Sequence, residues 1–304
     1  MAEHPQSPIY HSTNLPIYQS TNLPTYQPTN LPIMPEVILE TRDLHKAFGA
    51  LLAVDGVSIQ VQAGAIHSII GPNGAGKTTF FNLLSGNIQP TSGQVLYKGR
   101  DITRLPLYRT AHIGMGRSFQ ITNLFPNLTA FENVRLACQA MGRDNFAFWR
   151  SASRFSRYNE RAGAILEQVG LAARAGQLAG TLPHGDQRKL ELGIILASDP
   201  EVLLLDEPTA GMAAEQVPEL MALIQQVQQQ GSKTVVLVEH NMNVVMSISD
   251  RITVMHQGQV LAEGAPAEIA ANETVQNAYL GGLYELGGEG KEGKTGNKGK
   301  GGKK

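Results

Sequence analysis

The sequence predicts an α/β fold with a largely parallel core sheet, and two observations predict it. Short apolar runs alternate along the chain with segments of helical spacing, a pattern typical of a sheet covered by helices on both faces. One of these runs is followed by a glycine-rich loop that ends in Lys77-Thr78 and opens a helical segment. A strand, a glycine-rich loop and a helix in this order are the expected context of a phosphate-binding loop.

The strands are predicted from two kinds of pattern. Residues Val37–Thr41 and Val57–Val61 alternate apolar and polar side chains, as strands with one buried face do. Continuous apolar runs predict central strands covered on both faces. These runs are Ala65–Ile70, Val202–Leu205 and Thr234–Val238.

Helices are predicted where apolar residues recur at helical spacing. The predicted segments are Thr79–Leu84, Phe131–Met141, Asn159–Val169, Arg188–Leu196 and Val217–Gln228. The region from about residue 120 to 200 holds helices and no good strand. We therefore expect a helical subdomain inserted into the α/β body.

The two ends of the 304-residue chain differ from its middle, which sets the expected domain boundaries. Residues 1–35 contain three copies of an eight-residue unit with a proline in each, which predicts a disordered arm. Residues 287–304 are glycine and lysine, which predicts a flexible basic tail, either simply solvated or weakly attracted to an anionic membrane. The folded body is predicted to span residues 36–286.

The composition excludes several classes of protein. The formal net charge of −1 gives no electrostatic case for nucleic-acid binding. One cysteine, Cys138, permits no internal disulfide and is expected to be buried in a helix. No stretch approaches the ~20 apolar residues that span a bilayer, and the first residues lack the pattern of a secretory signal. We expect a soluble or peripheral protein.

The loop after Ile70 carries the pattern G-x-x-x-x-G-K-T, and its backbone amides are predicted to cradle a phosphate chain. Lys77 is expected to bind the β- and γ-phosphates, and the Thr78 hydroxyl is placed to ligate Mg²⁺. The helix that follows adds the positive end of its dipole. The predicted nucleotide-binding residues are Gly71, Pro72, Asn73, Gly74, Ala75, Gly76, Lys77, Thr78 and Thr79.

Two later strands end in residues suited to nucleotide hydrolysis. Asp206 and Glu207 follow the apolar run Val202–Leu205, and His240 follows the run that ends at Val238. Asp206 is predicted to hold Mg²⁺ through water, and Glu207 to orient or deprotonate the attacking water. His240 is predicted to reach the γ-phosphate. Together with the phosphate loop, these residues predict an ATPase.

Residues about 36–280, with these motifs in this order, resemble the ATP-binding-cassette (ABC) family. The resemblance implies a cassette fold with an antiparallel β subdomain, and head-to-tail dimers that clamp each ATP between two chains. It implies that Phe48 stacks on adenine, and that Gln120 couples Mg²⁺ and water to the helical subdomain. The family signature, which contacts the partner's ATP, falls on Leu182, Pro183, His184, Gly185, Asp186 and Gln187.

Within this family, the chain resembles the ATPases of branched-chain amino acid importers. Three stretches carry the likeness: 116–134, 206–212 and 263–282. The likeness implies a second cassette ATPase, identical or homologous, two transmembrane permease subunits, an extracytoplasmic solute-binding protein, and a peripheral place on the cytoplasmic face of the plasma membrane. Related ATPases serve neutral amino acid, urea or amide importers and lipopolysaccharide export.

Two departures from the family pattern leave an alternative open. Pro183 stands where the signature has serine, and proline offers neither a hydroxyl nor an amide hydrogen. Ala213 stands where an aspartate is common in the dimer-contact loop. Both departures favour a hydrolysis-poor nucleotide-binding regulatory subunit, whereas Glu207 and His240 favour an active ATPase. A soluble cassette protein acting on DNA or ribosomes is a third class, and a single cassette without coiled-coil insertions disfavours it.

Overall fold

The computed structural model describes residues 36–118, 124–142 and 156–280. The chain divides into two units, Met1–Met34 and Pro35–Lys304, and the described residues belong to the second. The predicted arm and basic tail, and Gln120, lie outside the described residues.

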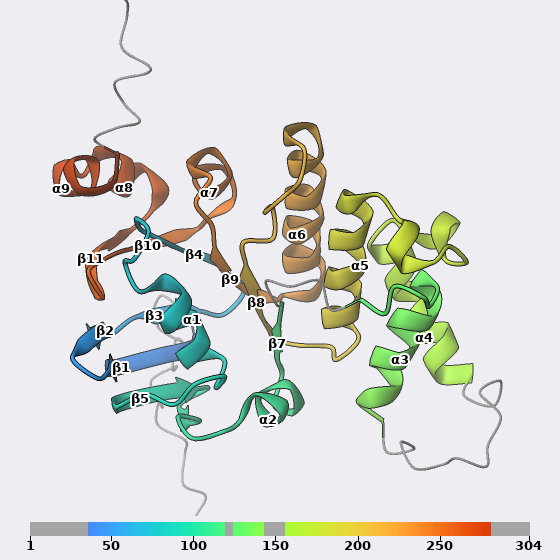
Figure 1. The fold of residues 1–304 in the computed structure, drawn as a ribbon, viewed down its shortest axis with the longest axis horizontal. Helices are drawn as coiled ribbons and strands as arrows, with labels where there is room; N and C mark the ends of the chain where they lie inside the picture. Colours follow the sequence, from blue (N-terminus) through green and yellow to red (C-terminus); the bar gives the residue numbers. More distant parts are fainter. Residues whose placement is uncertain (1–35, 119–123, 143–155, 281–304) are drawn as a thin grey trace, which may run out of the picture. The chain divides into compact units, whose positions relative to one another are not determined.

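A six-stranded sheet forms the centre of the body, with the order β11-β10-β4-β9-β8-β7 (Figure 1). Its strands are β4 (Ile66–Ile70), β7 (Met115–Arg117), β8 (Val202–Asp206), β9 (Thr234–Val238), β10 (Arg251–His256) and β11 (Gln259–Gly264). All neighbours pair in parallel except β10 and β11, which are antiparallel. The predicted parallel core is therefore confirmed, and the three apolar runs are its β4, β8 and β9.

A second, antiparallel sheet has the order β2-β1-β5-β6, with β3 also paired to β1. Its strands are β1 (Val37–Phe48), β2 (Leu51–Val57), β3 (Gln60–Gln62), β5 (Ser92–Tyr97) and β6 (Arg100–Asp101). The predicted strand Val57–Val61 is interrupted at Ser58 and Ile59, because Val57 ends β2 and Gln60 begins β3, although its alternating burial is as predicted. There the Thr41 hydroxyl donates to the Val57 carbonyl and accepts from the Ile59 amide.

Helices cover the parallel sheet, and three of them gather beside it as a group (Figure 1). The group consists of α3 (Ala130–Ala140), α4 (Ser156–Gln168) and α5 (His184–Leu196), and it is the predicted helical subdomain. The other helices are α1 (Lys77–Leu84), α2 (Leu107–His112), α6 (Val217–Gly231), α7 (Met242–Ile248), α8 (Pro266–Ala271) and α9 (Glu273–Val275). Helix α5 begins four residues before its predicted start, directly after Pro183 at its N-cap.

The apolar core lies on both faces of the parallel sheet, which explains the continuous apolar strands. On β8, Leu203 and Leu205 pack with helices α3 to α6. Val202 and Leu204 point the other way and pack with α1 and the antiparallel sheet. Cys138 is buried on α3, as predicted. No helix of the described residues is long and apolar enough to span a bilayer.

Candidate functional site

The predicted functional residues gather at one edge of the parallel sheet. The phosphate loop leaves the carboxyl end of β4, the Asp206–Glu207 pair lies at the end of β8, and His240 follows β9. Because β4, β9 and β8 are neighbours and run parallel, their carboxyl ends lie together. This edge, where ligands of open α/β sheets bind, is called the catalytic edge below.

Close packing makes two loop glycines necessary. A Cβ on Gly71 would lie 2.2 Å from the Met255 carbonyl oxygen, and one on Gly76 would lie 2.3 Å from that of Ala53. Gly76 also has a φ of 95°, in the left-handed region that favours glycine, and it caps α1 without a side-chain bond. The loop therefore wraps tightly against β2 and β10 and leaves the start of α1 to a ligand. Asn73 and Gly74 are exposed at its tip.

Lys77, the first residue of α1, folds back over this loop. Its ammonium donates to the carbonyl oxygens of Gly71 at 2.7 Å and Pro72 at 3.1 Å. Burial lowers the pKa of Lys77, and the carboxylates of Glu207 and Asp206 oppose that shift. A cation thus sits between the loop and the acids of β8. The next side chain, Thr78, is exposed, and Thr79 is half-buried.

Asp206 is a buried acid without a protein donor for its side chain. It is 4% exposed, and neither carboxylate oxygen has a hydrogen-bond partner among the described residues. Burial raises its pKa to about 6; Arg117 opposes the shift, and Glu207 adds to it. An uncompensated buried carboxyl group is costly in a folded protein. The site is therefore one where a cation or its water ligands would satisfy the acid.

Glu207 and His240 face each other beyond the strand ends. The His240 Nδ1 lies 3.7 Å from the Glu207 Oε1, and both side chains are accessible, at 61% and 32% exposure. Glu207 has a φ of 47°, rare for a residue with a side chain, and its amide donates to the Val238 carbonyl at 2.9 Å. The bend after β8 thereby turns the Glu207 carboxylate toward the loop that follows β9.

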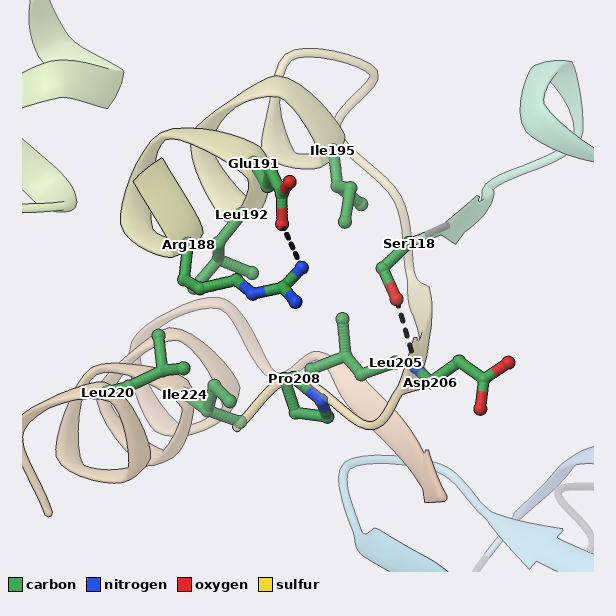
Figure 2. Close-up of a pocket in the computed structure, with 10 residues that line it drawn as sticks. All are labelled: Ser118, Arg188, Glu191, Leu192, Ile195, Leu205, Asp206, Pro208, Leu220 and Ile224. Carbon is green, nitrogen blue, oxygen red and sulfur yellow. Dashed lines mark hydrogen bonds and ion pairs between the residues drawn. The ribbon is translucent and has the colours of Figure 1, made fainter. Parts of the chain in front are cut away.

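Two residues of the site were not predicted: Arg117, the last residue of β7, and Ser118, which follows it. The Ser118 hydroxyl accepts from the Asp206 amide at 2.9 Å, which fixes the backbone of that acid (Figure 2). Arg117 bonds Asn82 of α1 at 2.6 Å, and its guanidinium lies over the Phe81 ring. β7 is a three-residue strand next to β8, too short for a pattern to reveal.

A pair of residues that was also not predicted, Thr209 and Glu239, joins the segments after β8 and β9. Glu239 is fully buried, and its carboxylate accepts from the amide and hydroxyl of Thr209 and from the His240 amide. The sequence signal was present, since Glu239 is a charged residue placed directly after an apolar strand. The histidine that follows it accounts for the motif by itself, so the pattern does not single out the acid.

Phe48 ends β1 with its ring half exposed, and the Lys46 ammonium lies 5.0 Å from the ring centroid. It pairs with Leu51, two residues before Ala53, whose carbonyl packs on the phosphate loop. An accessible aromatic ring therefore lies in the hairpin beside the phosphate loop.

The signature segment, residues 182–187, lies on the helical subdomain and not on the strand ends. Pro183 is exposed at the N-cap of α5, and His184 is exposed beside Gly211. Gly185 is buried against the Gln216 side chain. Asp186 pairs with Arg174 at 2.9 Å, and Gln187 donates to the Leu182 carbonyl. The described contacts of this segment are all to other residues of the protein, and Pro183 and His184 near its start are exposed to solvent.

Two family models match the chain. The model of the ABC transporter family matches residues 54–210. A model described as "Branched-chain amino acid ATP-binding cassette transporter" matches residues 259–284.

Known proteins agree with these models. The branched-chain amino acid transport ATP-binding protein BraF of Pseudomonas aeruginosa is 43% identical over 256 residues, covering 82% of this chain and 99% of that protein. The ADP conformation of MJ1267, a cassette of an ABC transporter, superposes with a TM-score of 0.71 at 30% identity, covering 81% of this chain and 99% of that one. The dimeric cassette MJ0796, bound to ADP and phosphate, gives a TM-score of 0.65 at 27% identity over 75% of this chain and 99% of that one.

Proposed function

The chain belongs to the ABC transporter family of ATP-binding proteins, and from this premise we propose that it is the ATP-hydrolysing motor subunit of an importer for branched-chain or other neutral amino acids. The observation that carries the hydrolytic part is the catalytic edge, where Lys77, Asp206, Glu207 and His240 meet. The transported class rests on the 43% identity to BraF over almost all of that protein, and on the branched-chain family match near the C-terminus.

ATP fits the catalytic edge by the chemistry of its residues. The phosphate loop offers backbone amides and the start of α1 to a phosphate chain. Lys77 supplies the positive charge that the phosphate chain requires. To do so, its ammonium would leave the carbonyl oxygens of the loop and bind phosphate oxygens instead. The exposed ring of Phe48 offers a stacking surface to adenine.

Mg²⁺ fits the same edge. Asp206 has two buried oxygens without a described donor, and the Thr78 hydroxyl is exposed at the start of α1. These two residues would hold the ion, with Gln120 as the third group that the family resemblance implies. Bound there, Mg²⁺ would neutralise phosphate charge.

Hydrolysis is assigned to Glu207 and His240. Glu207 accepts a proton from, or orients, the attacking water, since its carboxylate is accessible and lies beyond the strand end. His240 donates a hydrogen bond to the γ-phosphate, with Lys77 stabilising the charge that develops there. Glu207 also lies within 3.7 Å of His240, so the two groups are held against the same reacting centre.

Coupling ATP hydrolysis to transport would require a second cassette ATPase chain. A cassette dimer would close around ATP and reopen after hydrolysis, and the helical subdomain would pass this movement to two permease subunits at the cytoplasmic membrane face. Such coupling requires ATP to bind the closed state more tightly than the open one. A dimer is known for the related cassette MJ0796.

The test is an affinity pull-down of the full chain from detergent-solubilised host membranes, with partners counted by mass spectrometry. We expect two multi-span permeases, a second cassette ATPase and an extracytoplasmic binding protein. The recovered complex is then assayed for phosphate release with leucine, valine, lysine or urea, using the Glu207→Gln complex as the blank. Stimulation by leucine or valine supports the proposal. Stimulation only by urea would mean that the solute is urea and not an amino acid. Recovery of only soluble proteins would reject the proposed transport function.

A second function has one observation in its favour. Pro183 lies at the N-cap of α5, where the missing amide and hydroxyl would weaken contact with the partner's nucleotide. In an asymmetric ATPase pair of this kind, the partner's site would bind ATP and hydrolyse it slowly, so most turnover of the pulled-down complex would be lost when this chain, and not the partner ATPase, is inactivated.

A further inference from the structure

Glu239 is the one fully buried acid among the described residues at the catalytic edge, and none of its described bonds is to the phosphate loop. Its exposure is 0%, against 4% for Asp206. Unlike Asp206, it is saturated with donors. Its Oε1 accepts from the Thr209 amide at 3.0 Å and the Thr209 hydroxyl at 2.6 Å, and its Oε2 accepts from the His240 amide at 3.2 Å.

Burying a carboxylate is costly, and an apolar residue of similar size would avoid that cost. Among the described residues, no cation forms an ion pair with Glu239, so charge pairing does not account for it. Its bonds instead connect two segments that belong to different strands. Thr209 follows β8 and the catalytic acid Glu207, while Glu239 and His240 follow β9. The carboxylate therefore fixes the backbone of His240 relative to the segment after β8.

The other side of this segment contacts the helix that carries the signature. Arg188 of α5 donates from Nη2 to the Ala210 carbonyl at 3.1 Å, and it is also held by Glu191 at 2.8 Å. Figure 2 shows the Arg188 side chain reaching from α5 toward the chain at Pro208, just before Thr209. The ring of His184 lies beside Gly211. Residues 209–211 thus contact Glu239 at one end and α5 at the other.

We infer that Glu239 is a positioning residue, which together with Thr209 sets the place of His240 and links it to the movement of α5. The inference rests on the proposed function, because it concerns hydrolysis at the same edge. A rigid shift of α5 would pull on Ala210, and Thr209 and Glu239 would transmit that shift to the His240 backbone. The pair would thereby make hydrolysis depend on the state of the signature helix.

The test compares steady-state kcat, KM and ATP affinity in the purified complex for Glu239→Gln, Thr209→Val, the double variant and Thr209→Ser. Each single variant is expected to lower kcat about 10-fold or more, the loss expected for a hydrogen bond to a charged group. KM and the dissociation constant for ATP should change less than about twofold. The double variant should be no worse than Glu239→Gln, and Thr209→Ser should regain most of the lost kcat.

The matched control is Thr41→Val. Thr41 is also buried, at 1% exposure against 8% for Thr209, and its hydroxyl makes two hydrogen bonds, but it lies in the antiparallel sheet. It should lower the thermal midpoint and leave kcat unchanged. Thr209→Val that lowers only the thermal midpoint, as Thr41→Val does, would overturn the inference, as would additive losses in the double variant. A wild-type complex without ATP hydrolysis would instead reject the proposed function.

Discussion

The catalytic edge and the signature segment differ in how many polar and charged groups each offers to a nucleotide. At the catalytic edge, a cation, two acids and a histidine follow three parallel strands, and the Asp206 oxygens have no hydrogen-bond partner among the described residues. At the start of α5, Pro183 removes two donors from a segment whose described contacts are structural. The difference favours the proposal that this chain's own nucleotide site is complete, whereas the segment proposed to serve a partner's nucleotide lacks two donors.

The largest effect is expected from Glu207→Gln, which tests whether the catalytic edge is a working site. Removing the base should lower ATP hydrolysis about 100- to 10,000-fold. ATP binding should persist, because the amide keeps the shape of the side chain. Phosphate release and equilibrium ATP binding are measured side by side. Glu273→Gln, an exposed acid at the start of α9, is the matched control and should leave both unchanged. Equal losses in the two variants would contradict the role of Glu207.

Pro183→Ser tests the other half of the comparison. Restoring an amide and a hydroxyl at the N-cap of α5 should raise turnover about 10-fold or more, the value of one hydrogen bond to a charged group. The assay must use the complex, since the segment is proposed to contact the partner's nucleotide.

The matched control for Pro183→Ser is Pro266→Ser, because Pro266 also lies at the start of a helix, α8. Unchanged turnover in Pro183→Ser would mean that Pro183 does not lower turnover. The catalytic edge and the signature segment would then be equally functional.

Sequence patterns predicted the catalytic edge well because its residues follow long apolar strands. The runs at β4, β8 and β9 mark the sheet, and a parallel sheet brings its strand ends together without further information. The patterns missed β7 and Ser118 because this strand has only three residues. They missed Glu239 because His240, the next residue, carries the stronger signal. The strand expected at Val57–Val61 is interrupted at Ser58 and Ile59, where the Thr41 hydroxyl bonds the backbone of Val57 and Ile59, and alternation does not reveal such a break.

The third test concerns the unsatisfied acid of the catalytic edge. Burial raises the pKa of Asp206 to about 6, above its value in the unfolded chain, so the folded state favours the proton. The charged form therefore destabilises the ligand-free fold, and this penalty grows as pH rises from 4 to 6. Asp206→Asn should raise the unfolding free energy by on the order of 2 kcal/mol at pH 8 in EDTA, and by less at pH 5.

The control for that titration is Asp199→Asn. The Lys233 hydrogen bond lowers the pKa of Asp199, so its charged form stabilises the fold and its variant should lose stability at high pH. Denaturant unfolding at both pH values measures the two differences. A constant gap between Asp206→Asn and wild type at pH 5 and pH 8 would mean that the acid is not destabilised by burial.

The smallest effect lies in the strand that leads into the phosphate loop. His67 of β4 is 1% exposed, and its Nε2 lies 2.7 Å from the Thr253 hydroxyl. Burial lowers its pKa to about 4, and Arg251 adds to the shift. A depressed pKa means that the unfolded chain takes up the proton first, so this group's stabilisation is full above pH 6.5 and falls as pH drops toward 4.

Between pH 7.5 and 5.5, wild type should therefore lose on the order of 1 kcal/mol through His67. His67→Gln removes the titrating group and retains a side chain that can bond Thr253. Its unfolding free energy should change with pH less steeply than that of wild type, whatever its absolute value, and a curve parallel to wild type would contradict the assignment. Because the phosphate loop follows this strand and begins four residues after His67, acid would weaken the core beneath the catalytic edge while Asp206 gains its proton.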